Sequence, residues 1–204
     1  MTLLVNNVGL SNRTPVELGD MPLGEVEAIL AVNAVFTTRL TRALVPHLVA
    51  GARRRAGGRA GLITLSSMAG LMPAPLASVY GATKALNVGL SRALQTELRG
   101  ARVDAIAVAP GMVDCGNTPA WFGPGRMQLP DVASPDAVAD GILKLLRPTS
   151  ALWPSPPVLL PTVAHALNAA VVVALLPSAW AGEIVLRVHR AAATRMKQCA
   201  EKRQ

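Results

Sequence analysis

Two short stretches decide the fold, LITLSS at residues 62–67 and SVYGATK at residues 78–84. The first begins as an uninterrupted apolar run, which predicts a buried strand that ends at its two serines. The second opens a helix, with Ser78 as its N-cap and Gly100 as the residue that ends it. A strand followed by a helix in this way is the repeating unit of a parallel α/β sheet.

The same alternation extends on both sides of this unit. Apolar runs predict further strands at residues 2–5 and 103–108, and helical spacing predicts helices at residues 23–50 and 135–146. Pro46 should bend or weaken the last turns of the first of these helices. We therefore predict an α/β protein with a Rossmann-like, doubly wound parallel sheet joined by right-handed crossovers.

Composition limits the classes of function. The chain has 204 residues, a formal charge of +8 and only 3% aromatic residues. A nucleic-acid site needs basic residues on one face with aromatic residues between them, and this pattern is missing, so no nucleic-acid partner is expected. The run Arg53-Arg54-Arg55 ends a predicted helix, where solvation of the helix end is favoured over a patch for phosphate or an acidic partner.

Cys115 and Cys199 have no metal-ligand spacing, so no metal is expected and a reducing compartment fits. The start at Met1 shows no signal-peptide pattern.

The C-terminal part differs in composition from the rest. Residues 148–182 carry no Asp, Glu, Lys or Arg, and a basic segment follows them. The sequence predicts that residues 158–176 are either membrane-embedded or buried, and the apolar run between Pro161 and Pro177 is short for a membrane span of about 20 residues. Attachment to a membrane surface is slightly favoured over a buried helix that covers the substrate site or makes a dimer contact. We divide the chain into a catalytic part, residues 1–147, and an apolar helical extension with a basic tail, residues 148–204.

Tyr80 and Lys84 lie four residues apart on a predicted helix, so both project from one face. An ammonium beside a phenol favours the phenolate and draws the tyrosine pKa from about 10 toward neutrality. Tyr80 could then exchange a proton with a carbonyl or carbinol oxygen. Taken alone, such a pair could also be a coincidence of the helix surface.

Several motifs together resemble the short-chain dehydrogenases/reductases. They occur in the family's order: Asn6-Asn7-Val8-Gly9, Asn33, Ser67, Tyr80-Gly-Ala-Thr-Lys84 and Pro110-Gly111-Met112-Val113. The resemblance covers residues 1–147. It implies a Rossmann-like fold and hydride transfer between a nicotinamide cofactor and a ketone or secondary alcohol.

The resemblance implies a role for each catalytic residue. Tyr80 is the general acid/base, and Lys84 lowers its pKa and holds the nicotinamide ribose. Ser67 hydrogen-bonds the substrate oxygen, a role for which Ser66 competes although the spacing favours Ser67. Asn33 positions a water that links Lys84 to solvent, unless it is simply a polar residue of its helix.

Other residues are implied in cofactor and substrate binding. Asn7 and Gly9 flank the adenosine side of the cofactor, and Tyr80 and Lys84 hold the ribose. Further contacts to the nicotinamide end are implied for Pro110, Gly111 and Val113. Cys115 stands where many relatives have a threonine that binds the nicotinamide amide, and a thiol is a weaker donor. In the predicted substrate loop, Trp121 and Phe122 could contact substrate or pack the loop.

A looser resemblance points to a branch of the family. Val8, residues 72–75 and the apolar-then-basic C-terminus resemble the endoplasmic-reticulum branch of 17-beta-hydroxysteroid dehydrogenases and very-long-chain 3-oxoacyl-CoA reductases. Residues 110–111 are more typical of soluble members. The branch implies a lipophilic substrate, NADP(H) in preference to NAD(H), fatty acid elongation, and the cytosolic face of the endoplasmic reticulum membrane, with the cytoplasm as the alternative. A homodimer through the long helices is a further expectation.

One family element has no match in the sequence. Family members begin with a strand, a Gly-rich turn that holds the pyrophosphate, and a helix. Residues 57–61 are Gly-rich but precede a strand, which is the wrong context. We therefore expect an N-terminally truncated chain with an open apolar sheet edge. Its alternative function is that of an inactive interaction or regulatory partner.

Overall fold

A parallel sheet forms the centre of the molecule. The computed structural model describes residues 1–54, 58–114, 132–145, 158–159 and 178–201. Its four strands follow the order β1-β2-β3-β4, and all neighbours are parallel. The strands are β1 (Leu3–Asn6), β2 (Ala60–Leu65), β3 (Val103–Val108) and β4 (Val158–Leu159). The predicted α/β class is confirmed, whereas the short β4 was not predicted.

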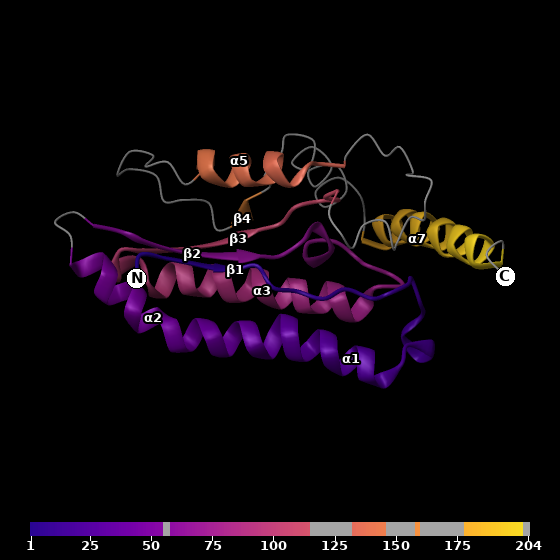
Figure 1. Cartoon of the computed structure of the whole chain (residues 1–204), viewed down its shortest axis with the longest axis horizontal. Helices are drawn as coiled ribbons and strands as arrows, with labels where there is room; N and C mark the ends of the chain where they lie inside the picture. The colour runs from indigo at the N-terminus through magenta and orange to yellow at the C-terminus, as the bar shows by residue number, and fades with distance from the viewer. Residues whose placement is uncertain (55–57, 115–131, 146–157, 160–177, 202–204) are drawn as a thin grey trace.

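Helices cover both faces of this sheet (Figure 1). On one face lie α1, α2 and α3, on the other lies α5, and α7 lies toward the end where the labelled C-terminus is drawn. Their bounds are α1 (Leu23–Leu30), α2 (Thr37–Arg53), α3 (Ser78–Glu97), α5 (Pro135–Leu145) and α7 (Ser178–Glu201). The short helical turns are the 3-10 turns η1 (Leu18–Asp20), η3 (Met68–Gly70) and η4 (Arg99–Ala101), and the π turn η2 (Ala31–Phe36).

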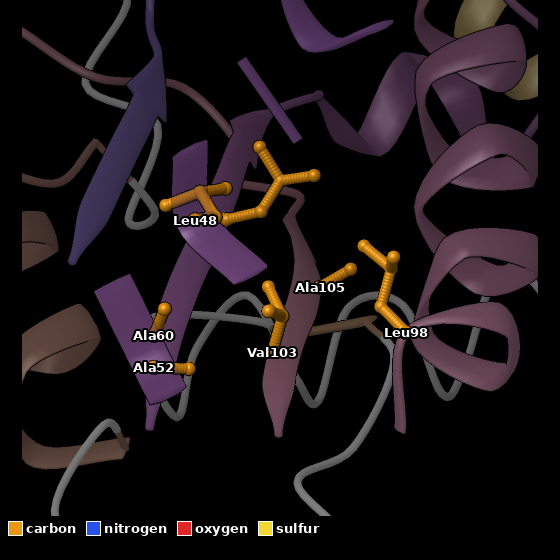
Figure 2. Packing of buried hydrophobic residues seen from close by; sticks show 7 residues of the cluster. Leu48, Ala52, Ala60, Leu98, Val103 and Ala105 are labelled. Atoms are coloured by element: carbon orange, nitrogen blue, oxygen red, sulfur yellow. The ribbon is translucent and has the colours of Figure 1, made fainter. Parts of the chain in front are cut away.

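Alternate residues of the central strands supply the two halves of the core. Leu62 and Ala105 pack with Leu48 of α2, while their neighbours Ile63 and Ile106 belong to a separate cluster with Ile142 of α5. This follows from the period of two in a strand, which sends successive side chains to opposite faces. Figure 2 shows the first cluster, with Leu48 and Ala52 of α2 near labelled residues of β2 and β3 and near Leu98, which follows α3. Burial on both faces explains why β2 and β3 are mostly apolar, with Thr64 and Asp104 as their polar residues.

The long N-terminal helix is interrupted by one wider turn. Residues Leu23–Arg53 form a helix that by length and apolar composition meets the criterion for a membrane span. It packs on the sheet through Leu48 and Ala52, and the π turn η2 occupies its middle. The helix continues through Pro46 to Arg53, beyond the predicted end at residue 50.

The predicted helix ends are partly wrong. Ser78 is the first residue of α3 and makes no cap, because the N-cap position is Ala77 and no side chain bonds there. Gly100 lies inside η4, and the left-handed residue that ends this region is Arg102, with φ of 58°. The start of α5 is confirmed, because the Ala137 amide donates to Ser134 Oγ at 3.1 Å.

β1 lies at one edge of the sheet. Leu3 and Val5 are 50% and 46% exposed there, which agrees with the expected apolar edge. At the other side, β4 joins the sheet beside β3, so the C-terminal segment shares the sheet with the predicted catalytic part. The predicted apolar stretch at residues 158–176 lies outside the described residues except for β4.

We expect Leu48→Ala to lower the free energy of unfolding by about 3 kcal/mol, because it opens a cavity between α2 and the sheet. Leu48 is fully buried, whereas Leu23 in α1 is 71% exposed. Leu23→Ala is therefore the matched control and should change stability by less than about 0.5 kcal/mol. Urea denaturation followed by circular dichroism measures both. Equal effects of the two substitutions would contradict the packing described for this face.

Candidate active site

The candidate site lies at the carboxyl ends of the parallel strands, which meet at one edge of the sheet. After β2, the chain is held to the segment after β3 by two backbone bonds. The Ser66 amide donates to the Val108 carbonyl at 2.7 Å, and the Met68 amide donates to the Pro110 carbonyl at 2.9 Å. Ser67 is therefore fixed between the ends of two strands.

Lys84 of α3 is buried beside this strand end. Its side chain is 5% exposed, and Nζ donates to the Leu65 carbonyl at 2.8 Å. The same ammonium lies over the Tyr80 ring, 5.6 Å from its centroid, at cation–π range. Burial lowers the pKa of Lys84 to about 8. In most molecules Lys84 is still protonated at pH 7, so a positive charge lies next to Tyr80.

The two adjacent serines have different environments. Ser66 is buried, and its hydroxyl donates to the Lys84 carbonyl at 2.7 Å. Ser67 is half-buried, and its Oγ accepts from the Ala69 amide at 3.2 Å as the N-cap of η3. Accepting that bond leaves the Ser67 hydroxyl proton to donate. Of the two, Ser67 is the one with a hydroxyl proton still to offer.

Asn33 lies inside the π turn and clamps the segment after β1. The Leu10 amide donates to Asn33 Oδ1 at 2.8 Å, and Asn33 Nδ2 donates to the Leu10 carbonyl at 2.8 Å. Nδ2 also donates to Thr83 Oγ1 at 3.0 Å. Because both Nδ2 hydrogens are used, only Oδ1 of this side chain could bind a further water, as an acceptor. Asn33 is fully buried.

Thr83 completes a chain of hydrogen bonds that sequence reasoning missed. Its hydroxyl accepts from Asn33 and donates to the Tyr80 carbonyl at 2.7 Å. Thr83 thus ties the π turn to the first turn of α3. Its position between Tyr80 and Lys84 was the available signal, since it faces inward one residue before Lys84.

Gly9 stands directly in front of the charged group. A Cβ placed on Gly9 would lie 3.2 Å from Lys84 Nζ and 3.4 Å from Asn33 Oδ1. A Cβ here would be tight against the ammonium and in ordinary contact with Asn33 Oδ1, so glycine suits the close packing of this segment on Lys84.

Two further glycines allow the segment between Ser67 and Tyr80 to pack closely against α3. A Cβ on Gly70 would lie 2.6 Å from the backbone carbon of Lys84, and one on Gly81 would lie 2.8 Å from Ala74 Cβ. Backbone approach this close requires glycine. Neither residue was identified from the sequence, because each is defined by a contact with another segment.

The remaining predicted site residues are dispersed around this centre. Asn7 is exposed after β1, and Pro110 and Gly111 are half-buried after β3. Val113 pairs with Ala133 in a parallel bridge, which closes the chain before α5. Three residues predicted near the substrate or nicotinamide lie outside the described residues: Cys115, Trp121 and Phe122.

Known proteins resemble this chain in sequence. The family model for short chain dehydrogenase matches residues 1–122. The very-long-chain 3-oxoacyl-CoA reductase of Yarrowia lipolytica is 35% identical over 117 residues, which cover 55% of this chain and 30% of the relative. The enzyme of the same name from Eremothecium gossypii is 36% identical over 113 residues, covering 55% and 32%. The chain thus spans about a third of the length of these curated relatives.

Solved structures agree in fold. The 3-ketoacyl-(acyl-carrier-protein) reductase from Brucella melitensis, complexed with NADH, is 25% identical with a TM-score of 0.65, covering 78% of this chain and 64% of the other. A 7beta-hydroxysteroid dehydrogenase structure has a TM-score of 0.74 at 19% identity, covering 91% and 67%. The second likeness concerns the fold alone. The family model covers more than half of the chain, and on that ground this chain belongs to the short-chain dehydrogenase family.

Proposed function

We propose that this chain carries the proton-transfer centre of an NAD(P)H-dependent oxidoreductase that interconverts a ketone and a secondary alcohol. The observation that carries the proposal is the buried ammonium of Lys84, 5.6 Å from the ring centroid of Tyr80. A cation held beside a phenol favours loss of the phenolic proton. No other tyrosine occurs in the sequence, so Tyr80 is the sole phenol that could serve.

In the direction of reduction, Tyr80 donates its hydroxyl proton to the substrate oxygen as negative charge develops there. Ser67 donates a hydrogen bond to the same oxygen, for which its proton remains available. The phenolate left on Tyr80 is stabilised by the Lys84 ammonium. The hydrogen bonds from Asn33 through Thr83 hold the Tyr80 backbone, so they fix where the proton is delivered.

The proposed role of Lys84 and Tyr80 in holding the nicotinamide ribose of the cofactor rests on the family resemblance. Lys84 Nζ and the Tyr80 hydroxyl would hold the ribose by hydrogen bonds to its hydroxyls. When bound, the cofactor supplies the hydride that chemistry of this kind requires. Roles for Asn7 and for residues 110–113 at the cofactor rest on the family resemblance. The preference for NADP(H) rests on the branch resemblance, since related structures hold NADH in one case and NADP in another.

A lipophilic 3-oxoacyl-CoA or 17-ketosteroid is the proposed substrate type. Supporting this, the curated relatives described above are very-long-chain 3-oxoacyl-CoA reductases. Fatty acid elongation at the cytosolic face of the endoplasmic reticulum membrane would follow. The apolar helix Leu23–Arg53 is compatible with membrane association but also serves as a core helix here.

The alternative function is that of an inactive interaction or regulatory partner. The observation that favours it is the apolar edge at β1, where Leu3 and Val5 are about half exposed. The sequence also contains no Gly-rich turn for the pyrophosphate. Both features fit a chain that has the catalytic residues but not a complete cofactor site. Cofactor affinity separates this alternative from catalysis by the chain itself.

We expect the 204-residue chain alone to bind NADPH negligibly, because the sequence has no turn for the pyrophosphate. Fluorescence titration of NADPH with the chain measures this. A dissociation constant in the micromolar range would contradict the expectation and would favour catalysis by the chain as it stands.

In a form of the protein that binds NADPH, we expect Tyr80→Phe to lower ketone reduction by at least about 100-fold, because the proton donor is removed. The cofactor oxidation rate with a saturating ketone substrate measures the loss. The circular dichroism spectrum should stay unchanged, since the phenyl ring keeps its packing. Near-normal turnover by the variant would show that Tyr80 is not the proton donor.

We expect the stability of the chain to rise with pH between about 8 and 10 because of Lys84. Its pKa is about 8 when folded and 10.5 in its ordinary state, so in this window the unfolded chain binds more protons. The rise should amount to about 2 kcal/mol by pH 10. Urea denaturation of Tyr80→Phe and of the double variant Tyr80→Phe/Lys84→Met isolates the effect, because the phenol that Lys84 influences is absent from both. Parallel pH profiles would mean that Lys84 keeps its ordinary pKa.

A further inference from the structure

The turn at residues 73–76, between Ser67 and Tyr80, needs anchors from outside itself. Pro73 and Pro75 have no amide hydrogens, so the turn offers carbonyls with few donors of its own. Leu76 adopts a left-handed conformation with φ of 63°, which is unfavourable for a residue that has a Cβ. Such a conformation persists only when surrounding contacts hold it.

One carbonyl of this turn is held by the N-terminal segment. The Leu76 carbonyl accepts from the Val16 amide and from Asn12 Nδ2, both at 3.1 Å. Asn12 is buried, so its bond is protected from water. These contacts fix one side of the turn.

The neighbouring carbonyl is held by the C-terminal helix. Nδ1 of His189, in α7, lies 2.6 Å from the Pro75 carbonyl. A carbonyl can only accept, so Nδ1 carries the proton and donates it. His189 is half-buried, and burial lowers its pKa, so the ring is neutral near pH 7.

Other contacts place the same face of α7 on this part of the chain. A Cβ on Gly182 would lie 3.5 Å from Pro73 Cβ, and Gly182 and His189 are seven residues, or two helical turns, apart. Arg190 lies 4.0 Å from Glu17, an exposed pair that adds little stability. The residues between them that share the half-buried face are Val185 and Leu186. In Figure 1, α7 is drawn near the end of the molecule at which the labelled strands finish.

We propose that His189 is a positioning residue, which anchors the turn at residues 73–76 to α7 and thereby fixes Ser67 relative to Tyr80 at the substrate site. The inference rests on the proposed function for the roles of Ser67 and Tyr80. One side of the segment between Ser67 and Tyr80 packs closely on α3, with contacts at Gly70 and Gly81. The position of its opposite side therefore depends on other contacts. His189 determines that side from a part of the chain remote in sequence.

The anchor can be tested by amide hydrogen exchange on the 204-residue chain. The Ala77 amide, bonded to the Ala74 carbonyl, and the Val16 amide, bonded to the Leu76 carbonyl, report on the turn. His189→Leu keeps the apolar bulk but removes the donor, and we expect both amides to exchange about 10-fold faster. His189→Asn retains a donor near the position of Nδ1 and should restore exchange to within about threefold. The matched control is His47→Leu, because His47 is exposed on α2.

Kinetics of an NADPH-binding form test the positioning role. His189→Leu should raise KM for the ketone about 10-fold and leave KM for NADPH within about twofold, because Lys84 is anchored separately through Leu65. Partial misfolding would instead lower the maximal rate at constant KM. Unchanged exchange in His189→Leu, or no rescue by His189→Asn, overturns the anchor whatever the activity. Faster exchange with an unchanged KM for the ketone overturns the positioning role, and a wild type without reductase activity overturns the proposed function but not the anchor.

Discussion

The site depends on a reciprocal tie between the end of β2 and Lys84. The ammonium of Lys84 donates to the Leu65 carbonyl, and the hydroxyl of Ser66 donates back to the Lys84 carbonyl. Burying a charged group costs several kcal/mol unless it is hydrogen-bonded, so α3 must dock where these bonds form. Gly70 permits that docking, because a side chain there would collide with the Lys84 backbone. The position of Tyr80, the candidate proton donor, and the positive charge of Lys84 beside it therefore follow from one helix–strand contact.

A second constraint acts through the amide of Asn33. This side chain replaces a strand partner for Leu10, bonding both its amide and its carbonyl, while it also bonds Thr83 on α3. A buried amide with its donors satisfied is rigid, and removing it would leave several buried polar groups unpaired. Asn33 lies in a π turn, and from this turn its amide bonds two segments at once. Three segments distant in sequence are thus held at the same place as Lys84.

Much of the fold could be predicted because its signals are local. β3, from Val103 to Val108, was predicted with correct bounds, since a strand buried on both faces has a mostly apolar sequence, here interrupted only by Asp104. The π turn could not be predicted, because Asn33 adopts it for bonds to Leu10 and Thr83, which are set by tertiary structure. β4 could not be predicted either, since two residues carry no periodicity and pair only because β3 is already in place.

The same distinction between local signals and tertiary contacts applies to the candidate site. Tyr80 and Lys84 could be placed together from sequence, because four residues along a helix always share a face. Ser66 could not be separated from Ser67 on chemistry, because the difference lies in a bond from Ser66 to the Lys84 carbonyl. His189 carried no motif at all. Its role comes from its contact with the carbonyl of Pro75. That carbonyl is an acceptor in a turn with few donors of its own, and a helix from the far end of the chain can reach it. Residues that act on the chemistry are therefore visible in sequence, whereas residues that hold them in place are visible only in the folded chain.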